Sequence, residues 1–91
     1  MRAIVLSTQF RKDLKLARRR NLPIEKLNEI VFMLANDMEL PMNNHDHALT
    51  GNKTGFRECH IQPDWLLIYN KVEGEVQILN LYRTGSHSDL F

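Results

Sequence analysis

The chain has few of the features that mark secreted and membrane proteins. Its 91 residues include one cysteine, Cys59, so no internal disulfide can form, as is usual in the reducing cytosol. The longest apolar run, residues 30–35, has six residues, whereas a membrane span needs roughly 20. The apolar stretch at residues 3–6 is too short for the core of a signal peptide. We therefore expect a single cytoplasmic domain, residues 1–91, with no membrane segment.

The chain as a whole has almost no net charge, but positive and negative residues are unevenly distributed along it. The net charge is +1, yet residues 1–22 carry +6, residues 23–50 carry −4 and residues 51–91 carry −1. One basic element on a near-neutral domain suggests contact with a polyanion, although a solvated helix face explains the charge equally well. The basic side chains concerned are Arg11, Lys12, Lys15, Arg18, Arg19 and Arg20.

The N-terminal half predicts one strand followed by two helices. Residues 3–6 are apolar on both faces and partly β-branched, which predicts an internal strand rather than an edge. Apolar residues then recur at helical spacing and predict an amphipathic helix that ends before Pro23; its stripe is Phe10, Leu14 and Ala17. The stripe of the second helix is Ile24, Leu27, Ile30, Val31, Leu34 and Met38.

The C-terminal half predicts a sheet. Residues 40–55 are rich in Asn, His and Gly and predict a long loop, which in a compact domain is often functional. Strands are predicted at residues 56–61, 65–70 and 76–83, joined by hairpin turns, and the middle one should be central because it is apolar on both faces. The predicted fold is α+β in the order β-α-α-β-β-β, with a helical hairpin packed on a mostly antiparallel four-stranded sheet.

Groups that exchange protons near neutral pH are predicted to meet at one end of this sheet. His60 and Asp64 flank the first hairpin turn, and His87 follows the last strand closely enough for the tail to fold back over the same end of the sheet. His47 can reach this end only if the long loop also folds toward it. Histidine changes charge between about pH 5 and 8. The set therefore suits cleavage of RNA by its own 2′-hydroxyl, which needs a base, an acid and a cation at the phosphate. The candidate phosphate-binding residues are Arg83, Lys53 and Arg57.

Several of these residues also have a purely structural explanation. His60 and Asp64 could close the hairpin by a hydrogen bond, and Arg57 could form an ion pair at the sheet edge. Trp65 is most simply a core residue, although at the start of a strand it could stack on a base. A zinc site is disfavoured, because Cys59 and His60 are neighbours on a strand and point to opposite faces. We expect no metal and no cofactor.

Several short motifs occur in order along the chain. They are Lys-Asp-Leu-Lys-Leu-Ala at residues 12–17, Asp-His-Ala-Leu-Thr-Gly at 46–51, Asp-Trp-Leu-Leu-Ile-Tyr at 64–69 and Arg-Thr-Gly-Ser-His at 83–87 with Leu-Phe at 90–91. Together they resemble the YafQ-type toxins of the RelE/ParE superfamily, small ribosome-dependent mRNA endonucleases of bacterial toxin–antitoxin pairs. The resemblance covers nearly the whole chain. Ser86 stands where threonine is common in the family.

The resemblance implies a RelE-like microbial RNase type fold and a function. Such toxins cleave mRNA in the ribosomal A site and contact 16S rRNA of the small subunit through basic surface. A cognate antitoxin covers the active site, and operator DNA is bound only through the toxin–antitoxin complex. The family's functional positions correspond here to His47, His60, Asp64, Trp65, Arg83, His87 and Phe91.

Among these positions we expect His87 to be the general acid and His47 the general base. His60 and Asp64 would position groups and stabilise charge, and Arg83 would bind the scissile phosphate. Such coupled groups titrate as a set. The main alternative is a ParE-like protein of the same fold that poisons gyrase by binding, and a second is a plain RNA-binding module. The histidines favour the nuclease, because a binding poison has no need of them.

Overall fold

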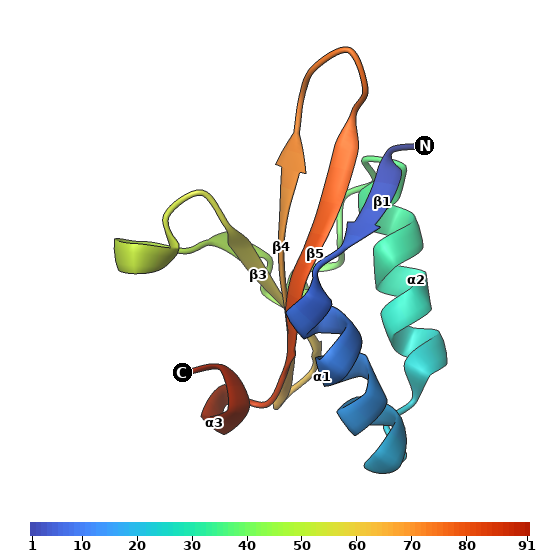
Figure 1. Ribbon diagram of the computed structural model, residues 1–91, viewed down its shortest axis with the longest axis vertical. Coiled ribbons are helices and arrows are strands. Elements are labelled where there is room, and N and C mark those ends of the chain that lie inside the picture. The colour runs from blue at the N-terminus through green and yellow to red at the C-terminus, as the bar shows by residue number, and fades with distance from the viewer.

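The sheet carries helices on both faces, two long ones on one side and a short one on the other. In the computed structural model, which describes residues 1–91, Figure 1 shows α1 (Thr8–Arg19) and α2 (Ile24–Ala35) on one side of the strands and α3 (His87–Leu90) on the other. The strands are β1 (Ala3–Leu6), β2 (His47–Ala48), β3 (Arg57–Gln62), β4 (Trp65–Val72) and β5 (Ile78–Gly85). The predicted α+β class is confirmed. None of the helices has the length and apolar character of a membrane span.

The strand order is β1-β5-β4-β3-β2. β1 is parallel to β5, and the other pairs are antiparallel. The prediction that residues 3–6 form an internal strand is wrong, because β1 is an edge on which Ile4 and Val5 are 41% and 46% exposed. The apolar character of β1 has a different reason: Leu6 packs against the core under the long helices.

The segment predicted as a long loop contains regular structure. Two 3₁₀ turns, η1 (Met42–Asn44) and η2 (Gly51–Lys53), flank β2, which adds a fifth strand to the predicted four. In β2, His47 pairs with Glu58 of β3. A strand of two residues is too short for its alternation to be read from the sequence. This pairing brings His47 to the sheet.

The long helices lie close to where the sequence predicts them. The N-terminus of α1 is capped by Ser7, whose hydroxyl oxygen accepts a hydrogen bond from the Phe10 N–H at 2.9 Å. Phe10 and Ala17 are buried as predicted. Met38 is not part of the second stripe: Asp37 has a positive φ of 55°, so the chain leaves the helix and Met38 is 48% exposed. The buried residues of α2 are Leu27, Ile30, Leu34 and Ala35.

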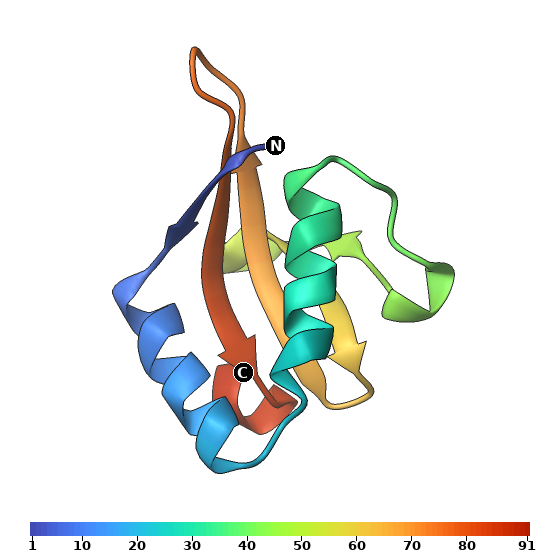
Figure 2. The ribbon, with the colours of Figure 1, turned by 90° about the vertical axis from the view of Figure 1, so that its right-hand side faces the viewer.

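The central strand β4 is buried on both faces, as predicted. Trp65 and Tyr69 belong to the core under α1 and α2. Leu66 and Ile68 point the other way and pack against Leu90 of α3. Figure 2 shows that the β4–β5 hairpin extends well beyond the rest of the sheet at the end remote from α3. We call the side covered by α3 the α3 face.

Pairing between β3 and β4 decides on which side the functional residues of β3 lie. Residues directly opposite each other on antiparallel strands share a face. Glu58 pairs with Ile68, and His60 pairs with Leu66, so both lie on the α3 face. Cys59, between them, is fully buried in the opposite core. The predicted separation of Cys59 from His60 is confirmed.

Candidate active site

The tail after β5 is held in a one-turn helix by its own polar side chains. Ser86 and Asp89 form a capping box, in which the Ser86 hydroxyl accepts from the Asp89 N–H at 3.2 Å and Asp89 Oδ2 accepts from the Ser86 N–H at 2.9 Å. Leu90 is buried against β4. A helix of four residues has no stability of its own, so these contacts determine where His87 stands.

His87 and Asp64 form a hydrogen-bonded pair on the α3 face. Asp64 Oδ1 accepts from the His87 backbone N–H at 3.0 Å and from ring nitrogen Nδ1 at 2.8 Å. These bonds, the backbone one first, hold the pKa of Asp64 below its usual range. Because an ionised carboxylate only accepts, Nδ1 carries a hydrogen and Nε2 remains available to a substrate. The side chains of His87 and Asp64 are 56% and 67% exposed, so the site is shallow.

A buried glutamate lies between the other two histidines. Glu58 is only 5% exposed. Its Oε1 atom lies 3.6 Å from His47 Nε2 and 3.7 Å from His60 Nε2. Glu58 was not predicted from the sequence, although strand alternation places residues 58 and 60 on one face. The carboxylate stands where it can hold both rings in place or pass a proton between them.

His47 and His60 are oriented by backbone carbonyls. His47 Nδ1 lies 2.6 Å from the His45 carbonyl oxygen, and His60 Nδ1 lies 3.3 Å from that of Pro63. A carbonyl oxygen only accepts, so each Nδ1 is assigned a hydrogen and each Nε2 is turned toward the glutamate. Nε2 is therefore the ring nitrogen that can exchange a proton in all three histidines: it faces Glu58 in His47 and His60 and is free of a protein partner in His87.

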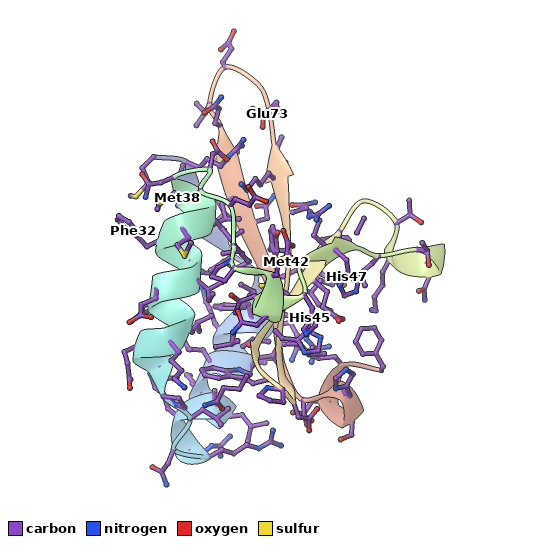
Figure 3. All side chains as sticks on the ribbon, turned by 180° about the vertical axis from the view of Figure 1, so that it is seen from behind. Phe32, Met38, Met42, His45, His47 and Glu73 are labelled. Carbon is purple, nitrogen blue, oxygen red and sulfur yellow. The ribbon has the colours of Figure 1, made fainter.

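The imidazole rings form a short row along the site. The rings of His45 and His60 stand edge to face with their centroids 5.3 Å apart, and those of His60 and His87 do so at 5.8 Å. Figure 3 shows His45 and His47 where the chain after α2 returns to the sheet. The structure thus brings together His47, His60, Asp64 and His87, which the sequence singled out, and adds His45 and Glu58.

Trp65 does not belong to this group. Its side chain is 2% exposed and lies in the core under α1 and α2. The indole ring therefore offers no face to a nucleotide base, and the prediction that Trp65 binds substrate by stacking is wrong. Strand alternation gives the reason, because Trp65 lies on the opposite side of β4 from Leu66, which faces α3.

Both of the predicted phosphate-binding arginines are already paired with carboxylates. Arg57 Nε lies 3.3 Å from Asp46 Oδ1, so the ion pair at the sheet edge is observed. Arg83 reaches α1, where Nε and Nη2 donate to the two carboxylate oxygens of Asp13 at 2.8 and 3.2 Å. Asp13 also accepts from the Thr84 N–H at 3.1 Å. Of the Arg83 guanidinium, only Nη1 is left without a protein partner.

The remaining two predicted substrate-binding residues lie together. The Lys53 ammonium stands over the Phe91 ring, 5.5 Å from its centroid. Phe91 is 62% exposed. The Phe91 N–H donates to the His87 carbonyl oxygen at 2.9 Å, so this cation and aromatic ring adjoin the segment that carries His87. They form a surface that suits a nucleotide, whose phosphate and base need these two kinds of contact.

The basic helix α1 presents most of its charge to solvent. All six basic residues predicted as a polyanion contact are exposed. Arg20 is not free to bind a polyanion as predicted, because its Nη1 and Nη2 atoms donate to the Asp89 carboxylate at 2.6 and 3.2 Å. The residues that form no ion pair are Arg11, Lys12, Lys15, Arg18 and Arg19.

A cation could be held by residues of this site. Glu58, His60 and His87 each offer one ligand atom, and the three atoms lie within 4.8 Å of one another. Two imidazole nitrogens and a carboxylate oxygen suit Zn²⁺ or Cu²⁺. The sequence does not predict this site, because its three residues lie on two separate segments of the chain and form no short ligand motif. Cys59 takes no part, because it faces the core and burial raises the pKa of its thiol to about 12.

A protein-family profile and known protein sequences match nearly the whole chain. The profile of the family described as "Bacterial toxin of type II toxin-antitoxin system, YafQ" matches residues 2–91. The mRNA interferase toxin YafQ of Escherichia coli K12 is 40% identical in an alignment 91 residues long, which covers 99% of this chain and 96% of that protein.

Solved structures agree with this match. YafQ in the crystal structure of the E. coli DinJ–YafQ toxin–antitoxin complex superposes with a TM-score of 0.86 at 40% identity, covering 99% of this chain and 97% of that one. A metal-bound toxin from Helicobacter pylori superposes with a TM-score of 0.91 at 40% identity over the full length of both chains. The chain therefore belongs to the YafQ family of bacterial toxins of type II toxin–antitoxin systems.

Proposed function

We propose that the protein is an mRNA-cleaving endoribonuclease and that its α3 face is the active site. The observation that carries the proposal is the Asp64–His87 pair, which stands beside His60 and the buried Glu58. A binding poison of the same fold needs no such arrangement of oriented imidazoles. The E. coli relative, named an mRNA interferase toxin, supports the same activity.

The proposed reaction uses the 2′-hydroxyl of the RNA as the nucleophile. A base takes the hydroxyl proton while the 2′-oxygen forms a bond to phosphorus; the bond from phosphorus to the 5′-oxygen breaks, and an acid protonates that oxygen. The products are a 2′,3′-cyclic phosphate and a 5′-hydroxyl. We assign the acid role to His87, which Asp64 orients with Nε2 outward, and the base role to His47.

Negative charge builds up on the phosphate during this reaction and needs fixed positive partners. His60 stands next to His87 and can stabilise that charge or help to place the acid. Arg83 can contribute through Nη1 while Asp13 fixes the rest of its guanidinium. Lys53, beside Phe91, supplies a second cation. These residues provide every proton and charge that the reaction requires, so we propose that it needs no metal.

The partners follow from the same surfaces. The five unpaired basic residues of α1 would contact 16S rRNA of the small ribosomal subunit, which makes cleavage depend on the ribosome in the cytoplasm. The relative of known structure from E. coli forms a complex with DinJ. We propose that a cognate antitoxin binds this chain in the same manner, blocks the site, and carries the complex to operator DNA.

Primer extension on an mRNA undergoing translation tests this proposal. Adding the protein should create discrete cut sites within codons of the translated message, and the same mRNA without ribosomes should stay intact. Intact mRNA together with DNA damage in cells would instead support a gyrase poison. Cleavage of free RNA at the same rate would contradict the proposed dependence on ribosomes.

Metal ions provide a separate prediction. EDTA should change the cleavage rate by less than about twofold, because His47 and His87 move the protons without a metal. Zn²⁺ or Cu²⁺ in slight excess should lower the rate severalfold, since a cation on Glu58, His60 and His87 would take the place of the proton that His87 donates. The measurement is the rate of cleavage with each addition. Loss of activity in EDTA that Zn²⁺ restores would contradict the metal-free mechanism.

A further inference from the structure

The segment that carries His87 is short and is joined to the rest of the protein through Leu90, the His87–Asp64 hydrogen bonds and Asp89. α3 consists of four residues and follows β5 after only Ser86. Its apolar anchor is Leu90, and its own helical hydrogen bonds are too few to keep it folded. Between this segment and α1 lies a cavity of about 210 Å³, lined among others by Asp13, Arg20, Gly85 and Asp89. Tight packing therefore does not hold the tail to α1.

An ion pair spans this gap. Arg20, at the end of α1, donates through Nη1 and Nη2 to the Asp89 carboxylate at 2.6 and 3.2 Å. The two-pronged geometry restrains both distance and direction. Asp89 is 25% exposed, and Oδ2 also accepts from the Ser86 N–H at 2.9 Å. Arg20 is the largest of the causes that hold the pKa of Asp89 well below its usual range.

Both ends of the ion pair are themselves fixed. On the α1 side, Asp13 lies two turns before Arg20 and accepts hydrogen bonds from Arg83 and from the Thr84 N–H, so α1 is anchored to the end of β5. On the tail side, Gly85 leaves room for the Asp89 carboxylate: a methyl group on Gly85 would stand 3.0 Å from Asp89 Cβ and Oδ2. The pair therefore joins a rigid helix to the turn that carries His87.

We propose that Arg20 is a positioning residue, which holds His87 on Asp64 by fixing Asp89 and with it the whole of α3. Arg20 has no contact with the groups assigned to proton transfer, so its effect passes through Asp89. The inference rests on the proposed endoribonuclease function for its catalytic consequence, but the restraint of the tail is independent of that function.

A comparison of Arg20→Ala with Arg19→Ala tests the inference. The two substitutions remove the same charge from adjacent exposed positions of α1, but only Arg20 has a carboxylate partner. Asp89→Asn removes the charge of the partner and keeps an oxygen that can accept from Ser86. The measurements are amide hydrogen exchange of residues 87–91 and the kcat and KM of cleavage on translating ribosomes.

Arg20→Ala should speed exchange of the tail amides and lower kcat by about three- to fivefold, the size expected for one exposed ion pair. Arg19→Ala should raise KM only and leave tail exchange as in the wild type. Asp89→Asn should resemble Arg20→Ala, and the double variant should be no worse than either single one. Arg20→Lys should lie in between.

Equal tail exchange and equal kcat in Arg20→Ala and Arg19→Ala would overturn the inference. So would strictly additive effects of Arg20→Ala and Asp89→Asn. If the wild type itself fails to cut mRNA, the proposed function is wrong, while the exchange comparison still decides whether Arg20 restrains the tail.

Discussion

Replacing His87 with alanine is expected to lower the rate of mRNA cleavage by about 10²- to 10⁴-fold, the usual contribution of a positioned general acid. His87 Nε2 is the ring nitrogen left free when Nδ1 donates to Asp64 at 2.8 Å. The fold should persist, because His87 is exposed and lies outside both apolar cores. The measurement is the single-turnover rate on translating ribosomes, together with growth arrest of cells that express the variant.

Ser88→Ala provides a matched control for His87→Ala. Ser88 is the next residue of α3 and is exposed, and its hydroxyl forms a single hydrogen bond, with the hydroxyl of Ser86 at 3.3 Å. This substitution should leave cleavage and toxicity close to those of the wild type. A folded His87→Ala protein that retained full toxicity would refute the assignment of His87 as the acid.

Replacing Glu58 with glutamine is expected to lower the cleavage rate by about 10- to 100-fold, the size of effect seen when catalytic groups are slightly misplaced. Glutamine keeps the shape of Glu58 but removes the charge that faces His47 Nε2 and His60 Nε2 at 3.6 and 3.7 Å. Both rings lose a fixed partner. The measurement is again the single-turnover rate, with the melting temperature as a check of the fold.

Glu75→Gln is the control for the loss of one negative charge, because Glu75 is exposed in the β4–β5 hairpin and forms no ion pair. Its rate should match that of the wild type. A Glu58→Gln protein that is as active as Glu75→Gln would show that the buried carboxylate has no part in catalysis and serves only the structure.

Much of the fold could be predicted from periodicity, because the apolar residues that build it recur at regular spacing. Phe10 and Ala17 on α1 and the continuous apolar run of β4 are buried as predicted. The edge position of β1 could not be predicted, since Ile4 and Val5 have the same β-branched character as an internal strand. β2 escaped prediction because it has two residues.

The sequence predicts only those site residues whose type by itself suggests a catalytic role. His60, Asp64 and His87 could be predicted as candidates from their residue types, because histidine and aspartate exchange protons. The turn between β3 and β4 joins the strand end at His60 to Asp64. Glu58 has no distinctive neighbours in the sequence, and its importance depends on burial between two rings. The prediction that Trp65 stacks on a base is wrong because β4 directs its side chain into the core on the opposite side of the sheet.

The arginines show a further limit of sequence-based prediction. Arg20 stands in a run of basic residues, where charge alone assigns it to a polyanion surface. Its carboxylate partner, Asp89, lies 69 residues away in the sequence. Arg83 likewise donates to Asp13, 70 residues away. Such pairings depend on the arrangement of the helices around the sheet, which no local pattern specifies.

The chemical nature of the new RNA ends tests the central claim most directly. If oriented imidazoles on the α3 face promote attack by the 2′-hydroxyl, the upstream fragment must end in a 2′,3′-cyclic phosphate and the downstream fragment must begin with a 5′-hydroxyl. A single 2′-deoxynucleotide at the cut position should then abolish cleavage there. An upstream fragment with a 3′-hydroxyl, or undiminished cleavage of the deoxy-substituted message, would contradict the account.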